Sequence, residues 1–359
     1  MKTNKIQRIE FFDREREKEE ILNILRTEPQ LINFIYGPIN SGKTTLITDM
    51  IENLPDDYVV FYINLRGKLI KEYGGFVRVL FKVKRKEISE KVIEKGEKLA
   101  KRALVLAGRY LSGIPIEKDM LDGFLDAEST EDVFEFLEEY FLKISEEKIP
   151  VLIIDELQVI GDLKINGKAI YKLFNFFIRL TKELHICHVF ALSSDSLFIE
   201  NVYSEAMLEG RANYILVDDF DEQTTKKFLE KYNISKEEQE LGWNYFGGKP
   251  GYLSDIVNTK FTGKDIKKAI EKTLKIRKGQ IEEIIYTLKD EDKEMFKGCT
   301  DVLKKFKDKD NFDYLNVTKY IRFLVGKNII FVNCAEKNIK AQSKINLLAM
   351  REILKEIGE

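Results

Sequence analysis

One short segment limits the folds open to this 359-residue chain more than any other: residues 37–44 read G-P-I-N-S-G-K-T. A β-branched and aromatic segment, residues 33–36, precedes it, and a helical pattern at residues 44–54 follows it. A glycine-containing loop between a buried strand and a helix directs backbone N–H groups and the positive end of the helix dipole to one point. In this context the spacing G-x-x-x-x-G-K-[ST] is that of a phosphate-binding P-loop. The sequence therefore predicts a nucleotide site.

The P-loop spacing assigns roles to particular side chains. Lys43 is expected to reach the β- and γ-phosphate oxygens, and the Thr44 hydroxyl is expected to bind Mg²⁺. ATP or ADP with Mg²⁺ are therefore the expected ligands. The residues expected to contact the nucleotide are Gly37, Pro38, Ile39, Asn40, Ser41, Gly42, Lys43, Thr44 and Thr45.

A second signal is an apolar strand, residues 151–154, which ends in Asp155 and Glu156. Ligands of open α/β sheets gather at the carboxyl ends of the strands, where the P-loop also lies. Asp155 is therefore predicted to hold Mg²⁺ together with Thr44, and Glu156 to orient and deprotonate the attacking water. A solvated strand end is the alternative interpretation, and the P-loop weakens it.

A third apolar strand, residues 188–192, ends in Ser193-Ser194-Asp195. A hydroxyl group at the tip of this strand is in a position to sense the γ-phosphate or the nucleophilic water. The spacing does not choose between Ser193 and Ser194. The alternative is that one of the two serines caps the helix that follows.

Short apolar segments predict the strands of an α/β fold. Most of them are apolar throughout, which is typical of a parallel sheet covered by helices on both faces. The five predicted strands are residues 33–36, 58–63, 151–154, 188–192 and 214–217. Residues from about 76 to 148 show helical patterns without a convincing strand, which predicts a helical insertion.

The remainder of the chain predicts two further units. From residue 222 the pattern is helical, and apolar segments at 329–332 and 345–348 predict a small hairpin after the helices. The expected fold is an α/β P-loop NTPase with a five-stranded parallel sheet, a helical lid and a C-terminal winged-helix-like domain. The expected boundaries are 1–220 for the core, 221–285 for the lid and 286–359 for the winged-helix-like domain.

Composition argues against several classes of protein. Apolar residues make up 44% and charged residues 33% of the chain, which supports folded cores rather than large-scale disorder. The formal charge of −2 gives no global attraction to nucleic acid or membrane. No window of 18 apolar residues and no signal-like amino terminus occur, so a cytoplasmic protein without a membrane partner is expected. The 3 cysteines have no paired spacing, which favours reduced structural thiols.

These motifs together resemble the archaeal ATPase family within the AAA+ and signalling-type (STAND) P-loop NTPases, with kinship to origin-recognition and Cdc6-like ATPases. The resemblance extends from Phe11 to about Val257 and more weakly beyond. Residues 12–17, F-D-R-E-R-E, resemble the motif that opens this family. Residues 41–45, S-G-K-T-T, match its Walker A motif, and residues 153–158, I-I-D-E-L-Q, match its Walker B motif.

The resemblance implies further site residues. It places Arg14 near the adenine, although an ion pair at the start of a helix is an equal alternative. Pro250, in Gly248-Lys249-Pro250, would open a lid helix near the nucleotide, and a proline at the first helical position is also explained by structure alone. Arg211 lies where relatives carry an arginine finger, which implies a homo-oligomer; a structural role is the alternative. No Arg follows Pro250 where many AAA+ relatives place a second sensor.

The carboxyl-terminal third is the basic part of the chain. Residues 264–359 contain 22 Lys and Arg against 16 Asp and Glu, an excess of 6. If the order of elements is that of a winged helix, Lys319, Arg322 and Lys327 lie on or just after the recognition helix, and Lys337 and Lys340 on the wing. Contact with DNA is one hypothesis, and a structural or protein-docking role is the other.

Three functions fit these observations. The first is an ATPase whose nucleotide state moves the C-terminal module relative to the P-loop core. The second is a nucleotide-gated DNA-binding protein of origin-recognition type with slow or no hydrolysis. The third is a scaffold that holds ADP as a structural cofactor.

Overall fold

The computed structural model describes residues 8–68, 70, 72–83, 110–126, 131–160, 169–204 and 208–357. Its centre is a six-stranded sheet in which all neighbouring strands are parallel. The order across the sheet is β4 (Tyr110–Leu111), β2 (Tyr58–Asn64), β6 (Ile149–Asp155), β7 (His188–Ser193), β1 (Ile32–Tyr36) and β8 (Ala212–Leu216). The five predicted strands are confirmed, and β4 adds a short strand at one edge.

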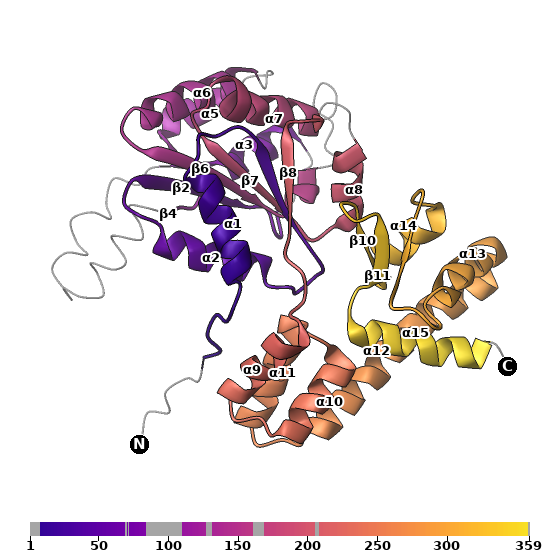
Figure 1. The fold of residues 1–359 in the computed structure, drawn as a ribbon. Helices are drawn as coiled ribbons and strands as arrows, with labels where there is room; N and C mark the ends of the chain where they lie inside the picture. Colours follow the sequence, from indigo (N-terminus) through magenta and orange to yellow (C-terminus); the bar gives the residue numbers. More distant parts are fainter. Residues whose placement is uncertain are drawn as a thin grey trace.

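Helices cover both faces of this sheet. Along β1, Phe34 points into one buried cluster and Ile35 into another. The cluster of Ile35 is closed by α1 (Glu15–Leu25) and α2 (Lys43–Asn53), and the cluster of Phe34 by α6 (Glu131–Ser145), α7 (Ala169–Ile178) and α8 (Ser196–Ser204) (Figure 1). Because both faces are buried, the strands are apolar throughout, which is why the sequence marks them clearly.

The segment between β2 and β6 contains strands as well as helices. The described elements there are α3 (Tyr73–Leu80), β3 (Phe81–Val83), β4, β5 (Ile114–Ile116), α5 (Lys118–Asp126) and α6. Strands β3 and β5 pair in parallel. The prediction of a purely helical insertion at about 76–148 is therefore wrong, because strands this short leave no alternating pattern in the sequence. Residues 84–109 and 127–130 of the insertion lie outside the described residues.

A helical lid follows the sheet. It consists of α9 (Glu222–Lys231), α10 (Lys236–Phe246), α11 (Pro250–Phe261) and the first part of α12 (Ile266–Glu291). Its core includes Phe228, Leu253 and Ile270. At the start of α10, Ser235 and Glu238 form a reciprocal capping box, which satisfies backbone N–H groups that the helix cannot.

The C-terminal module combines helices with a small antiparallel sheet. Its elements are α13 (Lys293–Lys304), β9 (Asn311–Asp313), α14 (Lys319–Gly326), β10 (Ile330–Asn333), β11 (Asn338–Ala341) and α15 (Lys344–Ile357). The sheet order is β10-β11-β9. The module thus has helices and an antiparallel hairpin, and its identity as a winged-helix domain stays a prediction.

Two expectations about this module need correction. The hairpin partner of β10 is β11, whereas residues 345–348 lie in α15. Burial of Ile345, Ala349 and Ile353 follows a helical period that the short segment 345–348 could not show. The expected boundary at 285–286 falls inside α12, which gives Ile270 to the lid core and Ile285 to the core of the C-terminal module.

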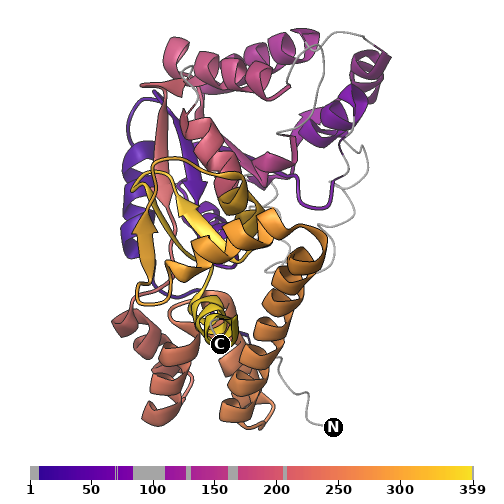
Figure 2. The same cartoon turned by 90° about the vertical axis from the view of Figure 1, so that its right-hand side faces the viewer.

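The C-terminal module lies against the P-loop core. Hairpin β10–β11 lies beside α8, and the Val332 backbone N–H donates to Ser196 Oγ at 3.2 Å (Figures 1 and 2). Within the described part of the chain, no helix is both long enough and apolar enough to cross a lipid bilayer.

Candidate functional site

The P-loop runs from the carboxyl end of β1 to the start of α2. A Cβ atom at Gly37 would lie 2.1 Å from the Val217 carbonyl oxygen, so the close approach of β8 requires glycine there. Gly42, the residue before α2, has φ 95°, a conformation that glycine adopts without strain. These two positions therefore explain why the spacing between the two glycines is diagnostic.

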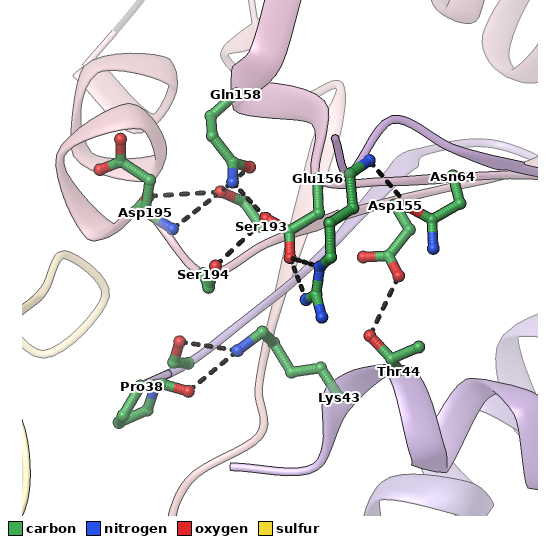
Figure 3. Close-up of polar contacts among 12 residues, drawn as sticks. Pro38, Lys43, Thr44, Asn64, Asp155, Glu156, Gln158, Ser193, Ser194 and Asp195 are labelled. Atoms are coloured by element: carbon green, nitrogen blue, oxygen red, sulfur yellow. Dashed lines mark hydrogen bonds and ion pairs between the residues drawn. The ribbon is translucent and has the colours of Figure 1, made fainter. Parts of the chain in front are cut away.

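The side chain of Lys43 points back into the loop. Its Nζ donates to the Gly37 carbonyl oxygen at 3.0 Å and to the Pro38 carbonyl oxygen at 2.9 Å (Figure 3). Burial, reinforced by the positive charge of Lys249, lowers the pKa of Lys43 to about 8. The acceptors of this ammonium group are neutral carbonyls, so an incoming polyphosphate would supply the anionic partner that it lacks.

Two oxygen groups suited to Mg²⁺ lie in contact at the carboxyl edge of the sheet. Thr44 Oγ1 donates to Asp155 Oδ2 at 3.0 Å (Figure 3). The Tyr62 hydroxyl donates to the same oxygen at 2.6 Å. Mg²⁺ prefers carboxylate and hydroxyl oxygens and keeps several waters. The hydroxyl of Thr44 and the carboxylate of Asp155 therefore fit this ion.

Glu156 is held by three side chains. Arg66 donates to its Oε1 through Nε at 3.1 Å and through a terminal nitrogen, while the Gln158 amide and Ser194 Oγ donate to Oε2, the latter at 3.3 Å. Burial by itself would raise the pKa of Glu156, but the hydrogen bonds from Arg66, Gln158 and Ser194 outweigh it and hold the pKa below its usual value. The backbone φ of Glu156 is 62°, a conformation uncommon outside glycine.

The two serines at the tip of β7 have different surroundings. Ser193 is buried, donates to Gln158 Oε1 at 2.8 Å, and accepts from the Asp195 backbone N–H at 3.1 Å. Ser194 lines the cavity beside the P-loop and donates to Glu156 (Figure 3). Ser194 is thus the serine that faces the cavity.

A cavity of about 410 Å³ lies beside these groups, and Lys43, Thr44 and Ser194 are among the residues that line it. One end is formed by the P-loop with Arg66 and Ser194, and the other end is aromatic and aliphatic, with Phe12, Phe220 and Phe228. Its volume lies within the usual range for small-molecule sites. A ligand with a polyanionic end and a flat apolar end fits this division of the lining.

Two family models cover most of the chain. Residues 11–256 match the ATPase domain found predominantly in Archaea. The chain belongs to this archaeal ATPase family. Residues 267–354 match the C-terminal domain of MJ1010-like uncharacterized ATP-binding proteins.

Related proteins match this chain along nearly its whole length. An uncharacterized ATP-binding protein of Methanocaldococcus jannaschii is 49% identical over 98% of this chain and 99% of its own. Another, from Pyrococcus abyssi, is 44% identical over 96% of this chain and 98% of its own. The relatives therefore match both the ATPase-domain region, residues 11–256, and the C-terminal region, residues 267–354.

Solved structures share the fold of this chain at low identity. A Walker-type ATPase of Pyrococcus abyssi has a TM-score of 0.64 and 18% identity over 97% of this chain and 98% of that one. The ORC2 protein of Aeropyrum pernix has a TM-score of 0.51 and 13% identity over 99% of this chain and 97% of that one. The expected kinship with origin-recognition ATPases is confirmed at the level of fold.

Arg14 connects three segments of the chain. Its guanidinium pairs with Glu17 at 2.7 Å, and donates to the carbonyl oxygens of Ser41 at 2.8 Å and Asp218 at 2.6 Å. It also lines the cavity and lies 4.5 Å from the centroid of the Phe220 ring. The ion pair weighed as an alternative is present, together with contacts to the P-loop and the segment before the lid.

Pro250 is the first residue of α11 and lines the cavity. The neighbouring Gly251 backbone N–H donates to the Asn40 carbonyl oxygen over an N···O distance of 3.4 Å, so α11 begins against the P-loop. A Cβ at Gly248 would lie 1.8 Å from the Phe220 carbonyl oxygen, which explains the glycine in the turn before it.

Arg211 lies away from the cavity. Its neighbour Ala212 begins β8 and pairs with Ile32, whereas the P-loop follows Tyr36, which pairs with Leu216 at the other end. The structure places Arg211 at the amino-terminal ends of β1 and β8, because the two strands are parallel and the P-loop follows the carboxyl end of β1. Sequence order alone does not show this direction.

Sequence reasoning missed three polar residues of the site: Tyr62, Arg66 and Gln158. Tyr62 and Arg66 come from β2 and the turn after it, and reach Asp155 and Glu156 because β2 pairs with β6, with Asn64 opposite Asp155. Gln158 lies two positions beyond Glu156, within the segment already compared with Walker B. The contacts of Tyr62 and Arg66 could not be predicted, because the sequence does not show that β2 lies next to β6.

Proposed function

We propose that this chain binds ATP and hydrolyses it to ADP and phosphate with Mg²⁺. The observation that carries the proposal is that Lys43, Thr44 and Ser194 line one cavity with an apolar end, while Thr44 and Ser194 donate to Asp155 and Glu156 directly behind them. Membership of an archaeal ATPase family and the ATP-binding relatives support it.

The site residues divide the chemistry between them. Backbone N–H groups of residues 39–44 and the ammonium of Lys43 bind the phosphates, and Phe12 and Phe228 contact the base. Thr44 and Asp155 would hold Mg²⁺, which neutralises phosphate charge when bound. Glu156 accepts a proton from the attacking water as its oxygen bonds to the γ-phosphorus and the bond to the β-phosphate oxygen breaks. Ser194 orients Glu156 and the water.

The experiment is Mg·ATP binding and turnover of the full chain beside two variants. Lys43→Ala should lose tight ATP binding, because the buried ammonium group that faces the β- and γ-phosphates is then missing. Glu156→Gln should bind Mg·ATP and lose about 10² to 10⁴ in turnover, the range for loss of a general base. Wild-type affinity in the first variant, or parental turnover in the second, would remove that residue from the proposed mechanism.

We also propose that the nucleotide state shifts the C-terminal module. Its hairpin touches three points next to the site: Asn333 bonds to Tyr36, Val332 to Ser196, and Lys340 to Asp218. These partners adjoin the P-loop, Ser194 and the lid. A change in any of them on nucleotide binding would strain the hairpin contacts.

Nucleotide-gated DNA binding remains the alternative, and it requires the module to leave the core. Arg322 on α14 lies 3.4 Å from Asn201 of α8, and Lys340 pairs with Asp218, so the core engages both of these cations. Lys319 pairs with Glu294 of α13 at 2.6 Å, within the module itself. Turnover and DNA affinity measured with ATP and with ADP at several salt concentrations separate the two functions. DNA binding that falls steeply with salt and needs ATP would favour the alternative.

A further inference from the structure

We propose that Arg66 is a γ-phosphate ligand from the same chain, and that ATP draws its guanidinium from Glu156 to the phosphate. This inference rests on the proposed ATP binding. It makes Arg66 the residue by which the site distinguishes ATP from ADP.

The backbone of Arg66 is fixed beside the reacting edge. Its N–H donates to Asn64 Oδ1 at 2.8 Å, and the preceding Leu65 N–H donates to the Asp155 carbonyl oxygen at 3.0 Å. Leu65 itself is buried. The long side chain of Arg66 therefore starts from a rigid point next to Asp155 and Glu156.

The side chain of Arg66 is free to move from that point. It is 66% exposed, whereas the Glu156 carboxylate with which it pairs is 11% exposed. It lines the same cavity as Lys43, Thr44 and Ser194. Water solvates the guanidinium well when the pair opens, and Gln158 and Ser194 still donate to the buried Glu156 carboxylate, so neither partner is left uncompensated. Exchanging this partner for another anion is thus a small rearrangement.

The cavity supplies few other cations to the terminal phosphate. The guanidinium of Arg14 already bonds to Glu17, Ser41 and Asp218. Arg211 lies at the amino-terminal ends of the strands, away from the P-loop. Among the arginines that line the cavity, Arg66 is the one in contact with Glu156, whose role places it beside the γ-phosphate. A guanidinium matches two phosphate oxygens at once, and phosphate carries more charge than one carboxylate.

The exchange links substrate recognition to the chemistry. While Arg66 is paired with Glu156, two N–H groups occupy the carboxylate oxygen Oε1. Once Arg66 moves to the γ-phosphate, that oxygen is open to water. ADP lacks the γ-phosphate and leaves the pair in place.

The test is calorimetric titration of the full chain with a non-hydrolysable ATP analogue and with ADP, each with Mg²⁺. In Arg66→Gln we expect the Kd of the analogue to rise about tenfold to a hundredfold, the range for lost hydrogen bonds to a charged group, and the Kd of ADP to change less than about twofold. Turnover should fall as well. Arg26→Gln removes an exposed arginine outside the cavity and should change neither Kd.

Several results would overturn the inference. Equal weakening of both nucleotides, an unchanged ratio of the two Kd values, or faster turnover in Arg66→Gln would each do so, the last because Arg66 would then only restrain Glu156. If Arg66→Gln fails to fold, Arg66→Lys decides. Lysine keeps the charge but lacks the planar guanidinium, so the Kd of ADP divided by the Kd of the analogue must still fall below its wild-type value. A wild-type chain that binds neither nucleotide overturns the proposed function too, whereas normal wild-type binding and turnover confine the failure to Arg66.

Discussion

The hydroxyl of Tyr36 donates a hydrogen bond of 2.9 Å to the side-chain oxygen of Asn333. Tyr36 is the last residue of β1 and directly precedes the P-loop, and Asn333 is the last residue of β10. The rings of Tyr36 and Phe331 also stack, with centroids 6.5 Å apart. The strand that carries the P-loop is therefore bonded directly to the C-terminal hairpin.

Tyr36→Phe should loosen this hairpin. Loss of one buried hydrogen bond should lower stability by about 1 kcal/mol. It should also speed hydrogen exchange of the β10 amides, measured by mass spectrometry. Tyr58→Phe is the matched control, because it loses a 2.9 Å bond to the Leu25 carbonyl oxygen far from the hairpin. Equal β10 protection in wild type and Tyr36→Phe would contradict the prediction.

Lys249→Met should be rescued by a second change. Lys249 is buried, and its ammonium pairs with Asp219 at 2.9 Å and donates to the Ile39 carbonyl oxygen at 3.2 Å. Removing it leaves the Asp219 carboxylate without its cation, at a cost of roughly 1–3 kcal/mol. The double variant with Asp219→Asn should recover part of this loss in urea unfolding. Additive losses in the double variant would show that the pair contributes nothing.

His188 should make the core sensitive to acid. Burial at the start of β7 lowers the pKa of His188 to about 4. As pH falls from about 6.5 to 4, the unfolded chain binds this proton before the native chain does, so stability falls, by up to roughly 3 kcal/mol. Unfolding free energies at pH 7, 5.5 and 4.5 should show a shallower decline in His188→Leu. Parallel declines in the two proteins would exclude His188 as the cause.

Arg211 stays a prediction as a residue that acts on a neighbouring subunit. Arg211 lies at the amino-terminal end of β8, away from the cavity, which excludes contact with a nucleotide bound in its own chain. Arg211→Ala should bind ATP normally but hydrolyse it slowly, and mixing it with Glu156→Gln should restore part of the turnover. No recovery in proven hetero-oligomers would reject the role in trans, and full turnover of Arg211→Ala alone would make the residue structural.

The sequence predicts the parts of the site that depend on local order along the chain. The P-loop, the carboxylates at the end of β6 and the serines at the end of β7 each lie where a mostly apolar strand ends, so their positions are readable from the sequence. Arg66 is not readable in this way, because its contact with Glu156 depends on β2 lying next to β6. The direction of β8, which decides the position of Arg211, is likewise a property of the assembled sheet.

Short elements explain the remaining differences. Strands β3, β4 and β5 have two or three residues each, fewer than a periodic pattern needs. The segment 345–348 is apolar enough to resemble a strand, and only its burial pattern in the folded chain identifies α15.

Helix α12 runs unbroken for 26 residues through the cores of both the lid and the C-terminal module. At about 1.5 Å per residue it is a stiff rod of roughly 39 Å, and a tilt of about 10° at its lid end would sweep its other end through about 7 Å. Helix α12 thus connects the two units rigidly, without a hinge between them. Because α11 begins against Asn40, a small displacement of the P-loop acts near the lid end of α12 and would be larger at its other end.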